Sequence, residues 1–383
     1  MNNSRNTMES LFSSMPEYNL NDYTVVVFGA GNTSALYQKC FELEGIYPVC
    51  YIDNNEAKHG TVFHGAPVIS VDELVSKQHT FDKPALVLIC SAQISICRQI
   101  QVQLQECELA YAVVDAIVFN KNKESIIKVY ELLEDDFSKD TYAEIVQARM
   151  NNSPVPESIL SNDQYFLPPQ FSDRSGNEVF VDIGAYVGDT VEEYLRQTLG
   201  VFEKIYAFEP DVNNFLALSH RAERLKKEWG FSDEKLIIVQ GGVGAKTESK
   251  AFSTPSDLEN QQSVTTRLEA SFAANTTEGA DEVIIHALDD YFREQRVSFI
   301  KADIESYELD MLRGAESVIK RDRPLLAVCL YHNASDMFTI PLFVKELYKG
   351  YKLKIRHYRY GFLETVLYAY VSDGDTVNGC NYV

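Results

Sequence analysis

Twice in this chain an apolar run of strand length stops at a glycine turn and passes into a helical stretch. The first is TVVVFGAGNTS at residues 24–34, and the second is EVFVDIGAYVGDT at residues 178–190. Further apolar runs and helical stretches alternate after each of them. Strands that alternate with helices are typical of a parallel sheet covered by helices. The sequence therefore predicts an α/β chain with two Rossmann-like sheets.

This alternation divides the 383 residues into four parts. We expect a mobile polar tail over 1–20, a smaller parallel α/β Rossmann-like domain over 21–122, a helical linker over 123–163 and a larger α/β domain over 164–383. The run YAVVDAIVF at 111–119 is predicted as a strand. The apolar spacing from Glu308 to Arg321 predicts one helix, which Pro324 stops.

Charge and composition exclude several classes of partner. The formal net charge is -21, which repels nucleic acid and anionic membranes. No apolar run approaches the roughly 20 residues that a membrane-spanning helix needs, and the start lacks the apolar block of a signal peptide. The seven cysteines form no CxxC pair, which favours reduced thiols. We expect a cytoplasmic protein with no nucleic-acid partner and no stable membrane insertion, and a homo-oligomer stays open.

The second glycine turn is the strongest candidate for a cofactor site. Ligands of open parallel sheets bind outside the carboxyl ends of the strands, where this turn lies. The next strand, KIYAFEP, ends at Glu209, whose carboxylate can accept hydrogen bonds from ribose hydroxyls. The alternative is a tight turn that binds nothing. The expected cofactor residues are Asp182, Gly184, Ala185, Tyr186, Gly188, Asp189, Thr190, Glu209, Gly242 and Val243.

Candidate catalytic residues close two later strands. Asp303 and Glu305 stand at the end of the strand VSFIKADIE, and His332 ends the strand LLAVCLYH. A histidine with an unperturbed pKa near 6.5 can take a proton, and an aspartate can orient an acceptor hydroxyl. The alternatives are that Glu305 only opens the next helix and that His332 only satisfies a buried strand end. No metal-ligand spacing is evident, so no metal is required, although Asp303 and Glu305 leave one open.

Together these motifs resemble the FkbM family of S-adenosylmethionine-dependent methyltransferases. The resemblance covers VFVDIGAYVGDT, YAFEPD, LDDYF, FIKADIESYELDMLRGAESVIKRDRP and LYHNASDMFTIPLFVKEL, from about residue 164 to 371. It implies a seven-stranded methyltransferase sheet, with Asp182, Gly184 and Gly188 near the methionine part of the cofactor and Glu209 at the ribose. It also implies methylation of hydroxyls on sugars or polyketide-derived compounds. Where the family usually has IEG, this chain has Ile304-Glu305-Ser306.

The first glycine turn is a weaker signal. Gly29, Gly31 and Asn32 follow a strand, and Asp53 closes the next one, but the third glycine of a dinucleotide motif is replaced by Ser34. This part resembles the nucleotide-fold domain of some sugar-modifying transferases. A nucleotide site and a purely structural module are both open.

The sequence thus predicts an O-methyltransferase that uses S-adenosylmethionine on a sugar or glycan hydroxyl, whether in a nucleotide-sugar, a polysaccharide or a related natural product. One rival is an NAD-dependent sugar-nucleotide oxidoreductase or epimerase, whose Tyr-x-x-x-Lys pair is not evident after the first glycine turn. Another is a non-catalytic nucleotide-binding module.

Overall fold

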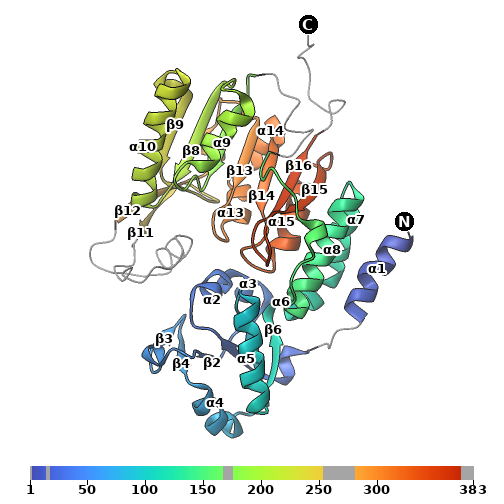
Figure 1. Cartoon of the computed structure of the whole chain (residues 1–383). Coiled ribbons are helices and arrows are strands. Elements are labelled where there is room, and N and C mark those ends of the chain that lie inside the picture. The colour runs from blue at the N-terminus through green and yellow to red at the C-terminus, as the bar shows by residue number, and fades with distance from the viewer. Residues whose placement is uncertain (1, 14–17, 167–175, 253–280, 372–383) are drawn as a thin grey trace.

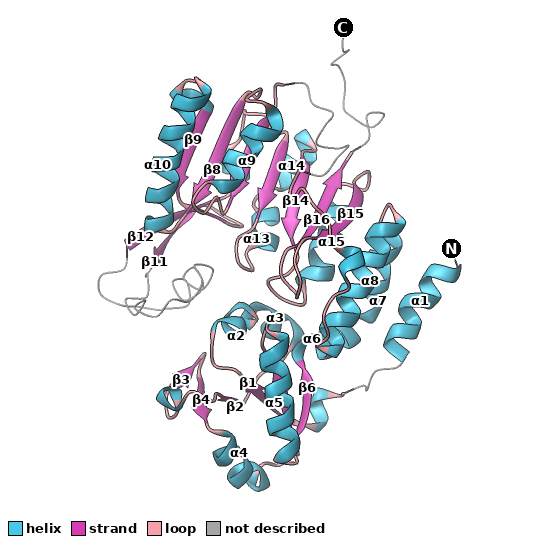
Figure 2. Ribbon diagram, in the orientation of Figure 1, coloured by secondary structure: helices cyan, strands magenta, loops and turns pink. Residues whose placement is uncertain are grey.

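The computed structural model describes residues 2–13, 18–166, 176–252 and 281–371. The chain forms two α/β units joined by helices, as Figures 1 and 2 show. The predicted fold class is confirmed by a six-stranded, mostly parallel sheet followed by a seven-stranded one. Among the helices in these ranges, none is both long enough and apolar enough to cross a bilayer.

The first sheet has the strand order β3-β4-β2-β1-β5-β6. Its central strand β1 pairs in parallel with β2 and β5, and the apolar side chains of all three strands are buried. The strands are β1 (Thr24–Phe28), β2 (Cys50–Ile52), β3 (Val62–Phe63), β4 (Ala66–Ile69), β5 (Ala85–Ile89) and β6 (Ala110–Val113). The helices are α2 (Asn32–Leu36), α3 (Gln38–Glu44), α4 (Val71–Lys77) and α5 (Ile94–Glu106).

The second sheet has the order β15-β16-β14-β13-β7-β8-β9, in which β16 runs antiparallel to both of its neighbours. Its strands are β7 (Val179–Ile183), β8 (Lys204–Glu209), β9 (Leu236–Gln240), β13 (Phe299–Ala302), β14 (Leu325–Cys329), β15 (Lys352–His357) and β16 (Thr365–Tyr370). A small sheet of β10 (Gly242–Val243), β12 (Asp281–His286) and β11 (Glu248–Phe252) lies beside it. The helices are α9 (Asp189–Thr198), α10 (Val212–Trp229), α12 (Leu288–Tyr291), α13 (Glu308–Arg313), α14 (Glu316–Asp322) and α15 (Asp336–Leu347).

The segment expected as a linker packs against both units. It contains α7 (Lys123–Leu132) and α8 (Asp136–Asn151), which follow α6 (Val114–Lys121) of the first unit. The start of α8 supports the edge strand β15, because Ser138 accepts a hydrogen bond from Ile355 N at 3.0 Å. On the other side, the buried guanidinium of Arg149 pairs with Asp115 of α6 at 2.7 Å and donates to the Tyr37 hydroxyl at 2.8 Å.

The polar start of the chain is not the tail that we expected. Residues 2–13 form helix α1, which lies beside α7 in Figure 1. Met8 and Phe12 of α1 are 0% and 7% exposed and belong to the main apolar cluster. Two apolar side chains four residues apart lie on one face of a helix, and their burial against α7 gives the short segment a reason to fold.

Two further predicted elements were wrong in detail. The run 111–119 is not one strand, because β6 ends at Val113 and α6 begins at Val114. A short apolar run that is buried on most sides does not distinguish a strand from a helix. The helix predicted from Glu308 is interrupted after Arg313 and forms α13 and α14, and at the interruption Gly314 packs so closely that a Cβ there would lie 2.0 Å from the backbone oxygen of Gly244.

At the far end of α10, Trp229 is the chain's single tryptophan. Its ring covers Gly200, where an added Cβ would lie 2.8 Å from the indole, and 37% of the residue stays exposed.

Candidate functional site

The second glycine turn passes directly against the end of β13. Gly184 has a φ of +75°, and a Cβ there would lie 2.0 Å from the backbone oxygen of Asp303. Only glycine permits both this backbone conformation and this approach. The turn and the predicted catalytic segment therefore meet backbone to backbone.

A cavity opens at this meeting point. Most of its lining is apolar, and Glu305 brings a carboxyl group to it. Of the expected cofactor residues, Gly184, Gly242 and Val243 line the cavity. The full lining is Ile183, Gly184, Phe208, Pro210, Gly241, Gly242, Val243, Ile285, Ile304, Glu305 and Tyr307.

Glu209 connects the end of β8 to the glycine turn. The residue is 1% exposed, and its carboxylate accepts hydrogen bonds from Tyr186 N and Asp211 N, both at 2.9 Å. Burial raises the pKa of Glu209 to about 7, although these backbone hydrogen bonds oppose the rise. The group thus titrates near neutral pH at the position expected to receive a ribose.

Asp182 lies behind the turn, away from the cavity lining. It is fully buried on β7 and pairs with Lys301 of β13 at 3.0 Å. Burial raises the pKa of Asp182 to about 6, against the lowering effect of the Lys301 charge. Lys301 also donates to the Gly184 oxygen at 2.8 Å. Asp182 thus holds the turn together with a lysine that the sequence reasoning missed, and its expected place near the methionine part stays a prediction.

The other expected cofactor residues shape the turn. Ala185 is buried and Tyr186 is 39% exposed with a φ of +50°. Gly188 has a φ of +83° and packs against α10, where a Cβ would lie 2.8 Å from Leu218. Asp189 and Thr190 begin α9.

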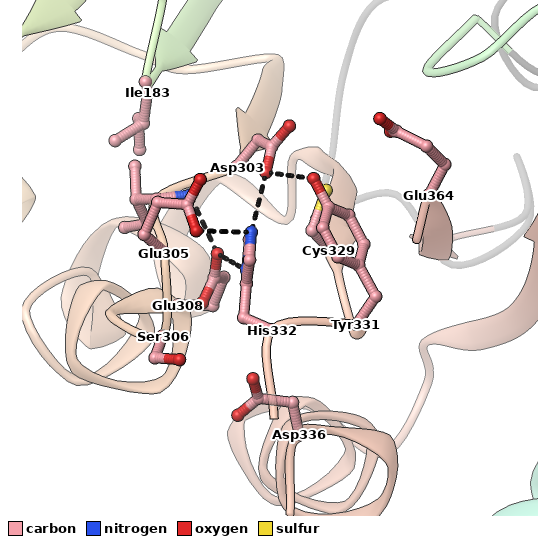
Figure 3. A network of polar contacts seen from close by, with 12 residues as sticks. Ile183, Asp303, Glu305, Ser306, Glu308, Cys329, Tyr331, His332, Asp336 and Glu364 are labelled. Carbon is pink, nitrogen blue, oxygen red and sulfur yellow. Dashed lines mark hydrogen bonds and ion pairs between the residues drawn. The ribbon is translucent and has the colours of Figure 1, made fainter. Parts of the chain in front are cut away.

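The predicted catalytic residues converge around one imidazole, as Figure 3 shows. His332 Nε2 lies 3.2 Å from Asp303 Oδ1 and 3.5 Å from Glu305 Oε2. On the other side of the ring, His332 Nδ1 lies 2.8 Å from Glu308 Oε1, which also accepts a hydrogen bond from Ile304 N at 2.8 Å. Glu308 was not expected here, because an acid in the first turn of a helix normally serves the helix.

This arrangement favours a charged His332 over the base that the sequence predicts, and the role of base stays a prediction. Burial alone would lower the pKa of His332, but the charges of Glu308 and Glu305 and hydrogen bonds to Asp303 and Glu308 raise it well above its ordinary value. The side chain is only 2% exposed. A buried imidazolium already holds its proton and cannot take another.

Asp303 is fixed by several donors at once. The Tyr165 hydroxyl donates to Oδ2 at 2.9 Å and the Tyr331 hydroxyl to Oδ1 at 2.8 Å. Burial opposes ionisation of Asp303, but the contacts with His332 and Lys301 hold its pKa well below its ordinary value. The two tyrosines were missed, although Tyr331 stands next to His332 in the sequence.

A metal was not required by the sequence, yet Asp303, Glu308 and His332 offer ligand atoms that lie within 4.8 Å of one another. The sequence showed no such set, because 24 residues separate Glu308 from His332 and only the fold brings them together. Both ring nitrogens of His332 already face carboxylates, so the cluster balances part of its charge internally.

The first glycine turn is filled by its own side chains. Asp53 accepts a hydrogen bond from Ala30 N at 3.0 Å, and Lys58 bridges Asp53 and the Ala30 oxygen, both at 2.8 Å. Gly31 caps α2 immediately before Asn32, and its nearest neighbour is Lys58 Nζ. The acid expected to bind a ribose is therefore engaged by the turn itself, which favours the structural alternative.

The seven-stranded sheet with one antiparallel strand, and a glycine turn facing a cavity at the carboxyl ends, form a Rossmann-like sheet of the kind found in methyltransferases. Residues 182–359 match the model of the methyltransferase FkbM domain, which confirms the predicted resemblance to this family and supports a methyltransferase. No curated protein matches the sequence.

Solved structures resemble the fold. The methyltransferase FkbM from Methylobacillus flagellatus is 18% identical with a TM-score of 0.53, over 95% of this chain and 93% of that one. An rRNA methylase from Streptococcus thermophilus is 13% identical with a TM-score of 0.30, over 52% and 89%. A putative methyltransferase from Streptococcus mutans, solved with SAH (S-adenosylhomocysteine), is 11% identical with a TM-score of 0.30, over 51% and 89%.

Proposed function

We propose that the chain transfers a methyl group from S-adenosylmethionine to a hydroxyl group of a sugar or glycan. The observation that carries the proposal is the convergence of the Gly184 turn, the β8 end and the β13 end on one cavity within the FkbM domain. The residues fit the cofactor, because apolar side chains can cover an adenine, and Phe208 and Pro210 on either side of Glu209 line the cavity.

Several residues would hold the cofactor. Phe208, Ile285 and Val243 would cover the base, Glu209 would accept hydrogen bonds from the ribose, and the Gly184 turn would lie along the amino-acid part. When bound, the cofactor supplies a methyl group on a sulfonium whose leaving group departs neutral. The protein then has to align an acceptor, exclude water and receive one proton.

Glu305 is the group we assign to receive that proton. It is the predicted catalytic residue that lines the cofactor cavity, and its carboxylate also belongs to the cluster around His332. His332 holds Glu305 and Asp303 in place as a buried cation, while Tyr331 and Asp303 orient the acceptor. Polar hydroxyls of a sugar suit such a set of carboxylates and phenols.

Isothermal titration calorimetry of the full chain with SAH and with NAD tests the cofactor. Binding of SAH and not NAD supports the proposal, whereas binding of NAD alone supports the oxidoreductase and overturns it. Absence of both favours a non-catalytic module. Candidate glycans and nucleotide-sugars are then incubated with S-adenosylmethionine, and mass spectrometry looks for a gain of one methylene group.

Once an acceptor is known, Glu305→Gln tests the proton acceptor. Loss of a general base typically costs about 10²–10⁴-fold in turnover, and SAH affinity should remain nearly unchanged. Glu316→Gln, an exposed acid on α14 of the same domain, is the matched control. Full turnover in Glu305→Gln would assign the proton to another group.

A further inference from the structure

The turn between β13 and α13 has an unusual backbone. Glu305 and Ser306 have φ values of +52° and +69°, in the left-handed region that favours glycine. The turn matters for the site, because Glu305 and Tyr307 on either side of Ser306 line the cofactor cavity. Something must therefore hold two consecutive non-glycine residues in this conformation.

The N-terminal domain supplies contacts that do so. Lys39 of α3 donates to the Ser306 oxygen at 3.3 Å and pairs with Asp310 of α13 at 2.7 Å. Its ammonium also lies 3.3 Å from the centre of the Tyr307 ring. One cation thus contacts the backbone, the ring and the helix that surround the turn, and in Figure 1 α3 lies against this side of the catalytic unit.

The Ser306 side chain adds a second link. Its hydroxyl donates to the Leu36 oxygen at the end of α2, at 3.3 Å, and accepts a hydrogen bond from Asn333 Nδ2, also at 3.3 Å. A glycine at this position would adopt the same φ more readily but would make neither contact. The serine that departs from the family's usual glycine therefore connects the two domains at the turn.

We propose that the N-terminal domain is part of the methyltransferase site, with Lys39 and Ser306 as positioning residues that hold Glu305 and Tyr307 against the cofactor cavity. This inference rests on the proposed cofactor site. It assigns α2 and α3 a task that does not require a ligand in the first glycine turn. It also means that the catalytic domain alone has a less well-formed cavity.

The test measures SAH affinity of the full chain by calorimetry in Lys39→Met and Lys39→Arg. Residues that couple two parts of a protein typically change affinity by about two- to thirtyfold. We expect Lys39→Met to weaken SAH binding in this range and Lys39→Arg to restore most of it, because arginine keeps the ion pair and the contact with the ring. Lys77→Met is the control, since Lys77 is an exposed lysine of α4 that pairs with Glu73 of the same helix.

Ser306→Ala and Ser306→Gly provide a second measurement. Both variants remove the link to Leu36, and both should weaken SAH binding, Ser306→Ala the more because alanine, unlike glycine, remains strained at a φ of +69°. Hydrogen exchange at residues 304–308 should accelerate in these variants and in Lys39→Met, but not in Lys77→Met. Unchanged SAH affinity in Lys39→Met and both Ser306 variants overturns the inference. If the wild-type chain itself fails to bind SAH, the proposed cofactor site falls and this inference falls with it.

Discussion

The two glycine turns start from similar sequences and have different surroundings. In the first, Asp53 and Lys58 occupy the space above the turn and bond to its backbone. In the second, the acid and the lysine, Asp182 and Lys301, lie behind the turn and leave its outer side open to a cavity. A strand, a glycine turn and a helix therefore do not define a ligand site by themselves, and the position of the nearest charged pair decides which turn remains accessible.

The largest expected effect is on stability, and it distinguishes the two glycine turns by how closely each glycine is packed. Gly184→Ala should cost about 3 kcal/mol or more, because the new Cβ would overlap the Asp303 oxygen and the φ is positive. Gly31→Ala should be nearly neutral, since its nearest neighbour is 3.6 Å away and is the end of a flexible lysine. Urea denaturation measures both. Equal stability of the two variants would contradict this reading of the turns.

The next-largest effect distinguishes Asp53, the acid that follows the first turn, from Glu209, the acid that follows the second. Glu209→Ala should lose about 1.5–3 kcal/mol of cofactor binding, the range for a charged hydrogen bond, which corresponds to about ten- to a hundredfold weaker SAH affinity. Asp53→Ala should leave SAH affinity unchanged, because Asp53 bonds to the first turn, to Lys58 and to Asn55 and does not line the cavity. Calorimetry measures the SAH affinity of both variants. Unchanged affinity in Glu209→Ala would remove the ribose assignment.

The pH dependence of binding sharpens the assignment of Glu209. Ribose hydroxyls donate to the ionised carboxylate, and burial raises its pKa to about 7. SAH affinity should therefore fall by about tenfold per pH unit below 7, and Glu209→Gln should flatten this slope. The stability of the folded protein should change with pH in the opposite direction. The folded state holds the proton of Glu209 more tightly than the unfolded state does, so the contribution of Glu209 to the free energy of unfolding decreases as the pH rises from 4.5 to about 7. A slope that is identical in Glu209→Gln would point to another group.

The smallest effect concerns ligands of the first turn. We expect nucleotides and nucleotide-sugars to leave the melting temperature of the wild-type chain unchanged. Ala30 N already donates a hydrogen bond to the Asp53 carboxylate, so neither group needs a ligand. The melting temperature of the Gly31→Val variant should likewise stay unchanged when the same ligands are added in a thermal-shift assay. Stabilisation of the wild type that disappears in Gly31→Val would restore a nucleotide site to this domain.

The overall architecture could be predicted from the sequence, because each strand and each glycine turn is a short segment of contiguous residues. Boundaries were harder where tertiary packing decides, as at Gly314, which packs closely against Gly244 where the helix that the apolar spacing left whole is interrupted. The position of Glu209 at a strand end could be predicted. Its raised pKa could not, since burial depends on the whole fold.

The catalytic cluster shows the same limit more clearly. Asp303, Glu305 and His332 could be selected because strand ends share one edge of a sheet. Their surroundings depended on Glu308, which raises the pKa of His332, and on tyrosines from distant segments. Lys301 carried a usable signal, because a lysine inside an apolar strand needs a buried partner.

The position of Trp229 determines what optical measurements can report. Helix α10 begins just after the β8 end that carries Glu209, and its 18 residues place the indole about 27 Å away along the helix axis. Intrinsic fluorescence should therefore follow melting of the methyltransferase sheet and stay nearly silent when a ligand enters the cavity. A tryptophan introduced at Tyr307, beside Lys39 and the cavity, would place a second emitter where docking of the two domains and arrival of the cofactor are both visible.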